Sequence, residues 1–304
     1  MTERQNTIWE KFLSPVVGLL IDEEGLKRYA LSVDWEKEGD RFHRLDVEIP
    51  AYYSNYKFRG IEGGYLNPQA VVNYDSVTQY LLPPNETLVR QALIDTIKVQ
   101  PRRILDLGCG TGSTTLMLKQ AFPQAEVIGL DLSPYMLVRA EHKATSADLN
   151  ILWRHGNAQR TALPQGSFDL VTVSLLLREI PSVVSQAILQ ESFRLLVVGG
   201  QILILDSNQK TLLQLEWLKE VFEEPYLREY ATLNLDESMG KAGFKAVQTH
   251  DVWWIHQVTS GVKPIYREDL TTYKNVRQYV PTSTDNTVDH NLGGLETPVF
   301  GIRA

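Results

Sequence analysis

The sequence predicts an α/β protein whose core is a doubly wound, mainly parallel seven-stranded sheet. Three observations favour this fold class. Short apolar runs of strand length alternate with helical stretches between about residues 101 and 206. Runs such as LVTVSLLL and ILIL lack polar alternation, which is typical of strands covered on both faces. A glycine-rich turn at residues 108–112 joins the first of these strands to the first helix.

The elements of this core are expected in a regular order along the chain. The patterns predict strands at residues 103–107, 126–130, 151–155, 169–175 and 201–205, and helices at residues 113–121, 134–142 and 181–196. Gly199 and Gly200 are expected to end the last of these helices. Residues 235–242 predict a further helix, and residues 244–258 predict one long strand or an antiparallel pair.

The flanking segments suggest three zones. Residues 1–85 predict a helical and loop lid over the substrate, residues 86–262 the core, and residues 263–304 an extended or partly disordered tail. Within the first zone, helical spacing is found in two segments, residues 8–20 and residues 23–31. Pro83-Pro84-Asn85 precedes a helix that holds Leu88 and Leu93, and residues 212–222 predict a helix after the last parallel strand.

Composition excludes several classes of function. The chain has 304 residues, a formal net charge of −7 and scattered basic residues, which disfavours nucleic acid as a partner. Its single cysteine excludes an internal disulfide framework, and no Cys/His spacing predicts a metal site. The apolar stretches are too short to span a bilayer and the N-terminus lacks a secretory pattern. We therefore expect a cytoplasmic protein with a small-molecule substrate, and a homodimer stays open.

The glycine turn predicts a ligand-binding loop. Gly108, Gly110 and Gly112 let the backbone turn tightly and approach a ligand, and the next helix points free N–H groups toward the same place. Their G-x-G-x-G spacing differs from the G-x-G-x-x-G of dinucleotide sites. Asp106 before the loop would repel a pyrophosphate but suits a ligand with an ammonium and a sulfonium. Asp131 ends the second strand, where a carboxylate can accept hydrogen bonds from ribose hydroxyls. The alternatives are a nicotinamide-dependent oxidoreductase or an inert turn.

This core resembles the class I S-adenosylmethionine (SAM)-dependent methyltransferases, especially the small-molecule branch that includes quinone-biosynthesis enzymes. The resemblance covers about residues 88–206 and rests on ILDLGCGTG, VIGLDLSPYML, HGNAQRTALPQGSFDLVTVSLLL and ESFRLLVVGGQILILD. It implies a Rossmann-like methyltransferase fold with SAM as cofactor.

The resemblance also assigns cofactor-binding residues. Asp106 would help to hold the methionine amino group, the three loop glycines would line the methionine and ribose, and Asp131 would take the ribose hydroxyls. Cofactor contacts are further implied for Cys109, Leu132, Met136, Asn157, Ala158 and Ser174. The family often has Gly-Asp-Ala where this chain has Gly156-Asn157-Ala158, so the Asn157 carbonyl oxygen would meet the adenine amino group. Cys109 is expected to be a small buried side chain rather than a nucleophile.

The acceptor side is less well defined by the sequence. Similar proteins often place a His-Glu pair where this chain has Arg178-Glu179, so no histidine base is available there. Glu179 could act as the base and Arg178 could hold an anionic substrate, or the two could simply form an ion pair that caps the next helix. Tyr74-Asp75 matches a lid element of related enzymes, which makes Tyr74 a second catalytic candidate.

Aromatic residues of the first zone could line the acceptor pocket. Tyr65 is the substrate-binding candidate among them, together with Tyr52, Tyr53 and Tyr56. SLLLREIP stands where amino methyltransferases acting on DNA bases or glutamine carry an Asn-Pro-Pro-Tyr element. The leading hypothesis is therefore a methyltransferase acting on an oxygen or carbon of a small, flat metabolite. The rival is a non-catalytic SAM-binding or partner-binding protein on the same fold.

Overall fold

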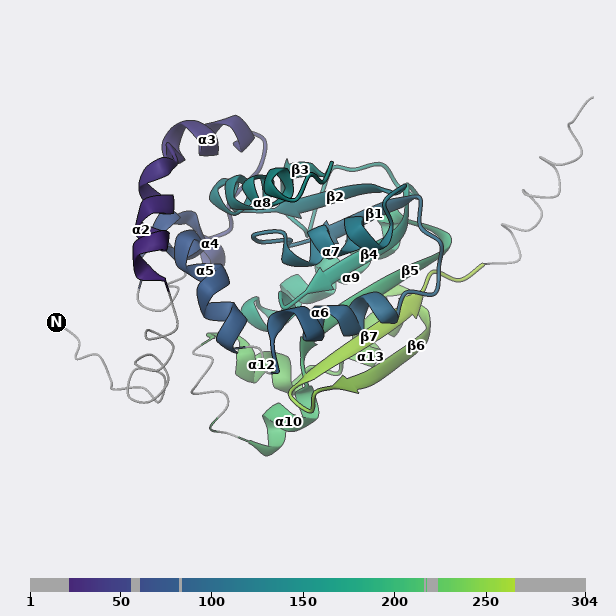
Figure 1. Cartoon of the computed structure of the whole chain (residues 1–304). Helices are drawn as coiled ribbons and strands as arrows, with labels where there is room; N and C mark the ends of the chain where they lie inside the picture. The colour runs from purple at the N-terminus through teal and green to yellow at the C-terminus, as the bar shows by residue number, and fades with distance from the viewer. Residues whose placement is uncertain (1–21, 56–60, 82–83, 216, 218–223, 266–304) are drawn as a thin grey trace, which may run out of the picture. The chain divides into compact units, whose positions relative to one another are not determined.

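The computed structural model describes residues 22–55, 61–81, 84–215, 217 and 224–265 (Figure 1). Its strands are β1 (Arg103–Leu107), β2 (Glu126–Asp131), β3 (Leu152–His155), β4 (Phe168–Ser174), β5 (Leu196–Ser207), β6 (Lys245–Val252) and β7 (His256–Val262). The helices of the core are α6 (Glu86–Asp95), α7 (Ser113–Ala121), α8 (Pro134–Ser146), η3 (Leu177–Glu179), α9 (Ser182–Leu195), α10 (Gln209–Gln214), α12 (Leu227–Thr232) and α13 (Leu235–Ala242). Ahead of the core lie α2 (Glu23–Ser32), α3 (Trp35–Phe42), α4 (Ala51–Ser54), η2 (Gly64–Leu66) and α5 (Pro68–Leu81).

The strands form one seven-stranded sheet in the order β3-β2-β1-β4-β5-β7-β6. The first five are parallel, whereas β7 runs antiparallel to both β5 and β6. The predicted fold class is therefore confirmed. Strand β1 and helices α7 and α13 have the predicted bounds, and α8 continues beyond its predicted end to Ser146.

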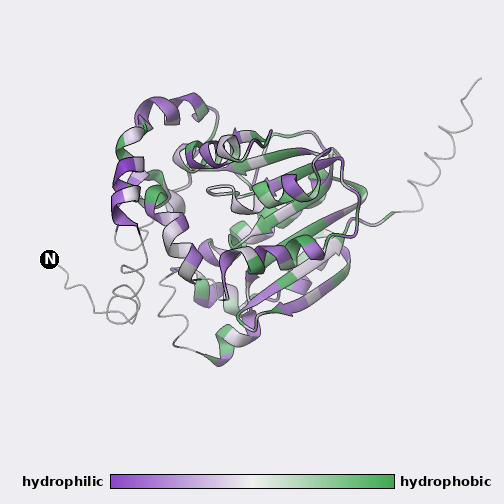
Figure 2. Ribbon diagram, viewed as in Figure 1, coloured by the Kyte–Doolittle hydropathy of each residue, from purple (hydrophilic) through white to green (hydrophobic). Residues whose placement is uncertain are grey.

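Both faces of the sheet are covered, as the unbroken apolar runs predict. Neighbouring residues of β1 point to opposite sides: Ile104 belongs to an apolar cluster with α6 and α7, and Leu105 to one with α9, α12 and α13. All these strand side chains are fully buried. Figure 2 shows the resulting concentration of hydrophobic residues on the central strands. This two-sided burial selects strands without polar alternation.

The prediction that Gly199 and Gly200 end a helix is wrong. Helix α9 ends at Leu195, and β5 begins at once with Leu196, so both glycines lie inside this strand. Gly199 has φ +81°, and a Cβ on Gly200 would lie 2.9 Å from the carbonyl oxygen of Val197. The pairing of β4 with β5 also shifts register between Phe168 and Leu170. The glycines thus accommodate an irregularity of the strand, which is a second common use of this residue.

The C-terminal part of the sheet is an antiparallel pair, as one of the two predicted alternatives states. Its second strand, β7, extends to Val262, beyond the predicted end at residue 258. The helix predicted at residues 212–222 is represented by α10, Gln209–Gln214; residues 216 and 218–223 lie outside the described part. The tail predicted from residue 263 also lies outside it, except for residues 263–265.

The helices ahead of the core pack on α8. Helix α2 begins after Asp22, whose carboxylate accepts the Gly25 N–H at 2.8 Å and caps the helix. The Tyr29 hydroxyl lies 3.0 Å from His142 Nδ1, and α3 and α5 also contact α8. The predicted helix at residues 23–31 is therefore confirmed. The segment at residues 8–20, together with Tyr56, lies outside the described residues.

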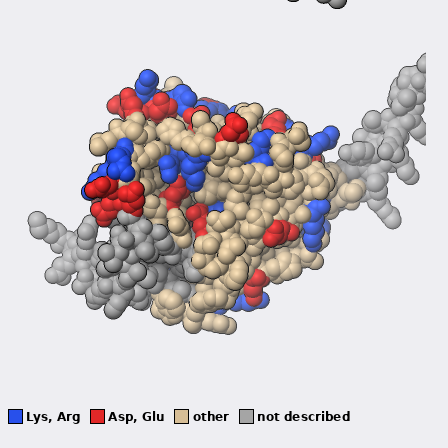
Figure 3. Space-filling view, in the orientation of Figure 1, with Lys and Arg blue, Asp and Glu red and all other residues tan. Residues whose placement is uncertain are grey.

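The surface carries charges of both signs. On the face shown in Figure 3, acidic and basic residues are interspersed, and no large basic patch forms among the described residues. None of the helices in the described part has the length and hydrophobicity that crossing a bilayer requires.

Buried His256 predicts a loss of stability in acid. The side chain is fully buried next to β5, and burial lowers its pKa to about 3 from 6.5. Above pH 6.5 the imidazole is neutral in both states. Between pH 6.5 and 3 only the unfolded chain binds the proton. The free energy of unfolding therefore decreases as the pH is lowered, by about 2 kcal/mol between pH 7 and pH 5.

The measurement is urea unfolding of wild type and H256L at pH 7 and pH 5. The wild type should lose about 2 kcal/mol more than the variant over this interval. Equal losses in the two proteins would show that His256 is not the group responsible.

Candidate active site

The glycine loop has the backbone conformation that its glycines permit. Gly108, Gly110 and Gly112 all have positive φ, at +65°, +53° and +79°. A Cβ on Gly108 would lie 2.6 Å from Leu176, whereas one on Gly110 would meet nothing within 4 Å. The backbone at Gly110 therefore borders open space, where a ligand can approach it closely.

Asp131 connects the end of β2 to this loop. Its carboxylate accepts the Gly110 N–H at 2.8 Å through one oxygen and the Ser133 N–H at 2.8 Å through the other. Burial raises its pKa to about 6, although these backbone hydrogen bonds oppose the change. The acid and the loop predicted from separate motifs thus meet at the carboxyl edge of the sheet.

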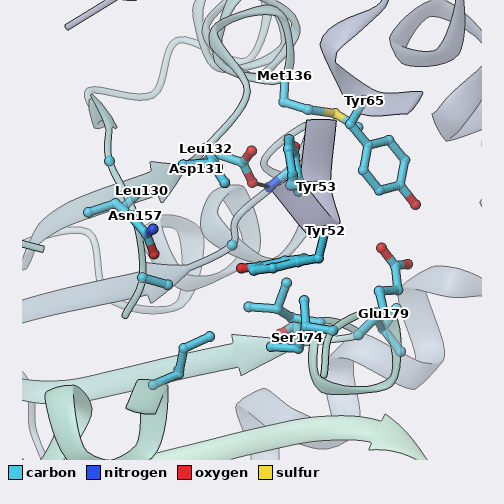
Figure 4. Close-up of a pocket in the computed structure, with 18 of the residues that line it drawn as sticks. Tyr52, Tyr53, Tyr65, Leu130, Asp131, Leu132, Met136, Asn157, Ser174 and Glu179 are labelled. Carbon is cyan, nitrogen blue, oxygen red and sulfur yellow. Dashed lines mark hydrogen bonds between the residues drawn. The ribbon is translucent and has the colours of Figure 1, made fainter. Parts of the chain in front are cut away.

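A cavity opens at this edge between the core and the N-terminal helices (Figure 4). It contains about 810 Å³ of atom-free space, its open mouth included. Its lining combines loop glycines, residues from the ends of β2 and β4, and aromatic residues of the lid: Tyr52, Tyr53, Tyr65, Tyr74, Gly108, Gly110, Leu130, Asp131, Leu132, Met136, Gly156, Asn157, Ala158, Ser174, Leu175, Leu176, Glu179, Ile180 and Ile188. Of the eleven predicted cofactor residues, eight line this cavity: Gly108, Gly110, Asp131, Leu132, Met136, Asn157, Ala158 and Ser174.

Two polar side chains in the lining differ in how they are satisfied. The Ser174 hydroxyl oxygen is buried and has no hydrogen-bond partner among the described residues. A buried hydroxyl without a partner is unfavourable, so this group suits a polar atom of a ligand. The side-chain oxygen of Asn157, Oδ1, by contrast, accepts the backbone N–H of Gln159 at 2.9 Å. The expected contact of Asn157 with an adenine amino group would have to share this oxygen.

Three predicted cofactor residues lie outside the main cavity. The Asp106 carboxylate accepts from Thr115 Oγ1 at 2.6 Å and from Thr172 Oγ1 at 2.7 Å, and burial raises its pKa. Asp106 and Cys109 line a smaller polar recess beside the loop. Cys109 is half-buried rather than fully buried as expected, and desolvation raises its pKa well above the usual value, which fits an inert side chain. Gly112 lies under Trp153, which a Cβ would approach to 2.7 Å.

The contrast between two of the glycines gives a test of the loop. G110A should fold with a modest loss of stability, on the order of 1 kcal/mol for an alanine at positive φ, but its methyl group would enter the open space and block ligand binding. G112A should lose more stability, because its methyl group also collides with Trp153.

Urea unfolding and calorimetric titration with S-adenosylhomocysteine would separate the two effects. G112A serves as the matched control, because it places the same methyl group in the same loop but away from the cavity. Wild-type affinity in G110A would mean that the ligand does not approach the loop there.

Glu179 and the tyrosines line a further part of the cavity. Burial, followed by repulsion from Glu224, raises the pKa of Glu179 to about 8, whereas Arg178 and a hydrogen bond with Tyr65 lower it. Figure 4 shows the Glu179 carboxyl group on the same side of the cavity as the Tyr65 hydroxyl. Tyr52 is fixed by a 3.1 Å hydrogen bond from Gln159. A carboxyl group that titrates near neutral pH thus faces an aromatic pocket.

Arg178 does not line the cavity, which corrects its prediction as a substrate-binding residue. Its guanidinium is buried, pairs with Glu224 at 3.0 Å and donates to Ser207 Oγ at 3.1 Å. The alternative of an ion pair with Glu179 is also wrong in its partner, since the described acids that pair with Arg178 are Glu224 and Asp206, which lie far along the chain. Sequence spacing gave no sign of this contact.

The Tyr74-Asp75 element connects the lid to the loop. Tyr74 borders both the cavity and the smaller recess, and burial raises its pKa above its usual value. Asp75 hydrogen-bonds to Thr111 of the loop and pairs with Arg139 at 3.0 Å and Lys143 at 3.1 Å. Although burial opposes it, these partners hold the Asp75 pKa below its usual value.

The recess beside the loop contains a cation that the sequence did not indicate. Arg90 of α6 is buried, pairs with Glu86 at 2.7 Å and donates to Thr114 Oγ1. It faces Asp106 and Tyr74 across the recess. An Arg in the middle of an amphipathic helix is usually a surface residue, so only the fold reveals that its head is buried.

Comparison with known proteins identifies the core. Residues 104–200 match the family model described as a methyltransferase domain. Residues 104–200 therefore correspond to a methyltransferase domain. Demethylmenaquinone methyltransferase from Thermus thermophilus is 37% identical over 117 residues, which are 38% of this chain and 52% of the relative. The enzyme of the same name from Geobacillus sp. is 33% identical over 144 residues, 46% of this chain and 61% of the relative.

A solved structure shows the same fold for the methyltransferase domain. Phosphoethanolamine N-methyltransferase 2 from Haemonchus contortus, in complex with SAM, superposes with a TM-score of 0.55 over 71% of this chain and 61% of that one, at 16% identity. The chain spans about half to three fifths of the length of the curated relatives it matches. The matched family region, residues 104–200, holds the loop, Asp131, Asn157, Ser174 and Glu179, whereas the lid lies outside it.

Proposed function

We propose that this methyltransferase domain binds SAM in the cavity and transfers its methyl group to an oxygen or carbon of a small, flat acceptor. One observation carries the proposal. The glycine loop and Asp131 line the same cavity as Glu179 and four tyrosines from the helices ahead of the core. Cofactor and acceptor groups therefore share one space, as a direct transfer requires.

The residues present fit the cofactor. The open space beside Gly110 admits a ligand to the loop, and the unpartnered Ser174 hydroxyl offers a hydrogen bond at the carboxyl end of β4. Asp131 would hold the ribose hydroxyls, while Leu132 and Met136 would pack on the adenine. When bound, SAM supplies an electrophilic methyl group on a sulfonium.

The acceptor side is suited to an aromatic molecule with an acidic proton. Tyr52, Tyr53 and Tyr65 provide flat apolar surface, and Glu179 would accept the proton that the acceptor loses. The lid helix, fixed by Asp75 to the loop, would exclude water from this space. Curated relatives named demethylmenaquinone methyltransferase support a quinol-like acceptor.

Two measurements test this function. In a thermal-shift assay, S-adenosylhomocysteine and SAM should raise the melting temperature and NAD should not, because a ligand of the folded state stabilises it. Stabilisation by NAD alone would mean an oxidoreductase. The full chain with radiolabelled SAM and a reduced 1,4-naphthoquinone should then yield a labelled organic product. Binding of SAM without transfer to any phenol or quinol would support the non-catalytic alternative.

A further inference from the structure

A buried group of charged side chains lies behind Glu179. The side chains of Arg178, Glu224 and Asp206 are 5%, 9% and 0% exposed. Arg178 Nε lies 3.0 Å from Glu224 Oε2 and 4.0 Å from Asp206 Oδ1. Glu179 is the next residue of the chain, so three buried carboxyl groups lie near the Arg178 guanidinium among the described residues.

Backbone hydrogen bonds surround the Asp206 carboxyl group. Its carboxylate accepts the N–H groups of Leu177 at 2.9 Å, Arg178 at 3.4 Å and Ser207 at 2.7 Å. Burial raises its pKa, but hydrogen bonds to the charged form and the nearby guanidinium oppose this effect. Glu224 has its own contact with Arg178 at 3.0 Å. Glu224 and Asp206 thus both interact with the positive charge of Arg178.

Glu179 is the carboxyl group that is left with the weakest compensation. Its side chain lines the cavity, and Figure 4 shows its carboxyl group directed at the Tyr65 hydroxyl. Among the described residues, one guanidinium lies beside these three carboxyl groups, and at low dielectric it favours a proton on one of them. Arg178 forms ion pairs with Glu224 and Asp206, and among the described residues it forms none with Glu179, so a proton on Glu179 breaks no ion pair.

We propose that Glu224 is a positioning residue that holds the Arg178 guanidinium away from Glu179 and thereby keeps a proton on Glu179 at neutral pH. This inference rests on the proposed function, in which Glu179 receives a proton from the acceptor. Glu224 would thus set the pH at which Glu179 becomes a base, without touching the acceptor itself.

The fold fixes Glu224 through the following helix. The Leu227 N–H donates to the Glu224 carbonyl oxygen at 3.3 Å, which leads into α12. Within α12, the Tyr230 hydroxyl donates to the Ser207 carbonyl oxygen at 3.0 Å, and the helix packs against η3. The positions of Glu224 and Arg178 are therefore linked through the carboxyl end of β5.

The other titratable side chains described around this cluster are tyrosines and a histidine, which stay uncharged near neutral pH. Tyr65 and Tyr74 of the lid and Tyr53 of α4 face Glu179, and burial raises the pKa of Tyr53 and Tyr74. Behind Arg178 lie Tyr230 of α12, whose pKa burial raises, and His256 of β7, which burial keeps neutral. A titration of Glu179 is thus not confused with theirs.

The test is a carbon-13 NMR titration of the full chain labelled at its glutamate side-chain carboxyl carbons. The Glu179 resonance is the one missing in E179Q. Its midpoint should be near pH 8 in wild type. In E224Q, proton binding should be about tenfold weaker, roughly one pH unit lower in midpoint, because a like charge is removed and Arg178 is released.

Two further variants complete the comparison. E224D keeps the negative charge but places it farther from Arg178, because its side chain is one methylene shorter. The Glu179 midpoint should therefore decrease by less than in E224Q. E224D also replaces E224Q in the comparison if E224Q does not fold. E229Q removes an exposed carboxylate of the nearby α12, which binds Ser182 at 2.9 Å, and should leave the midpoint unchanged.

The outcomes are distinct. Equal Glu179 midpoints in wild type, E224Q and E224D would overturn the inference, as would a wild-type midpoint in the ordinary acidic range of glutamate. A midpoint that depends on Glu224 in a protein that methylates no acceptor would retain the inference about the cluster and refute the proposed function.

Discussion

D131A is expected to weaken the binding of S-adenosylhomocysteine by about 1–3 kcal/mol, which is roughly five- to 150-fold in Kd. The variant removes the acceptor proposed for the ribose hydroxyls. It also removes the partner of the Gly110 N–H, at 2.8 Å, and so loosens the loop that lines the other side of the ligand. Isothermal titration calorimetry at pH 7.5 measures the change.

The pH dependence of this affinity provides a second readout. The Asp131 pKa is about 6, so the carboxylate is ionised at pH 7.5 and mostly protonated at pH 5. Since the ionised form is the better acceptor, wild-type affinity should fall as the pH drops below 6, and D131N should not show this fall. D95A is the matched control: Asp95 is exposed on α6 and binds only Gln91, at 2.8 Å. Unchanged affinity in D131A would remove Asp131 from the site.

E179Q is expected to lower kcat by about 10²–10⁴-fold, the usual contribution of a general base. The amide has nearly the shape of the carboxyl group but accepts no proton. Since Glu179 lies on the acceptor side of the cavity, the affinity for S-adenosylhomocysteine should stay close to that of wild type. Initial rates with radiolabelled SAM and calorimetry separate the two quantities.

The rate should also follow the protonation of Glu179. Its pKa is about 8, and only the deprotonated form accepts a proton, so kcat/KM should rise with pH up to about 8 and then level off. E179Q should lose this rise, whereas E229Q, which removes an exposed carboxylate of α12, should keep it. A normal rate in E179Q would assign the base elsewhere or indicate an acceptor that arrives as an anion.

Much of the cofactor side could be predicted from sequence because it is built from local signals. Gly108 and Gly110 lie where the backbone has positive φ, and Asp131 lies at a strand end. Each of them can therefore be recognised within a short segment of sequence. The same holds for the strands, whose apolar runs reflect burial on both faces. Gly199 and Gly200 show the limit of such signals, because a glycine can end a helix or relieve a bulge.

The acceptor side could not be predicted to the same degree, because its properties arise from pairs of residues far apart in sequence. Arg178 is engaged by Glu224, Lys143 by Asp75, and Tyr52 by Gln159. Each contact depends on the three-dimensional position of a helix or loop, and no spacing along the chain encodes it.

By itself, then, the sequence determined the doubly wound sheet, the glycine loop and the acid that ends β2, because backbone conformation and burial constrain residue types one position at a time. Only the tertiary structure decided that Glu179 faces the cavity while Arg178 does not, and that burial raises the pKa of Glu179 to about 8. Those properties follow from desolvation and from the sum of nearby charges, which exist only once the chain has folded.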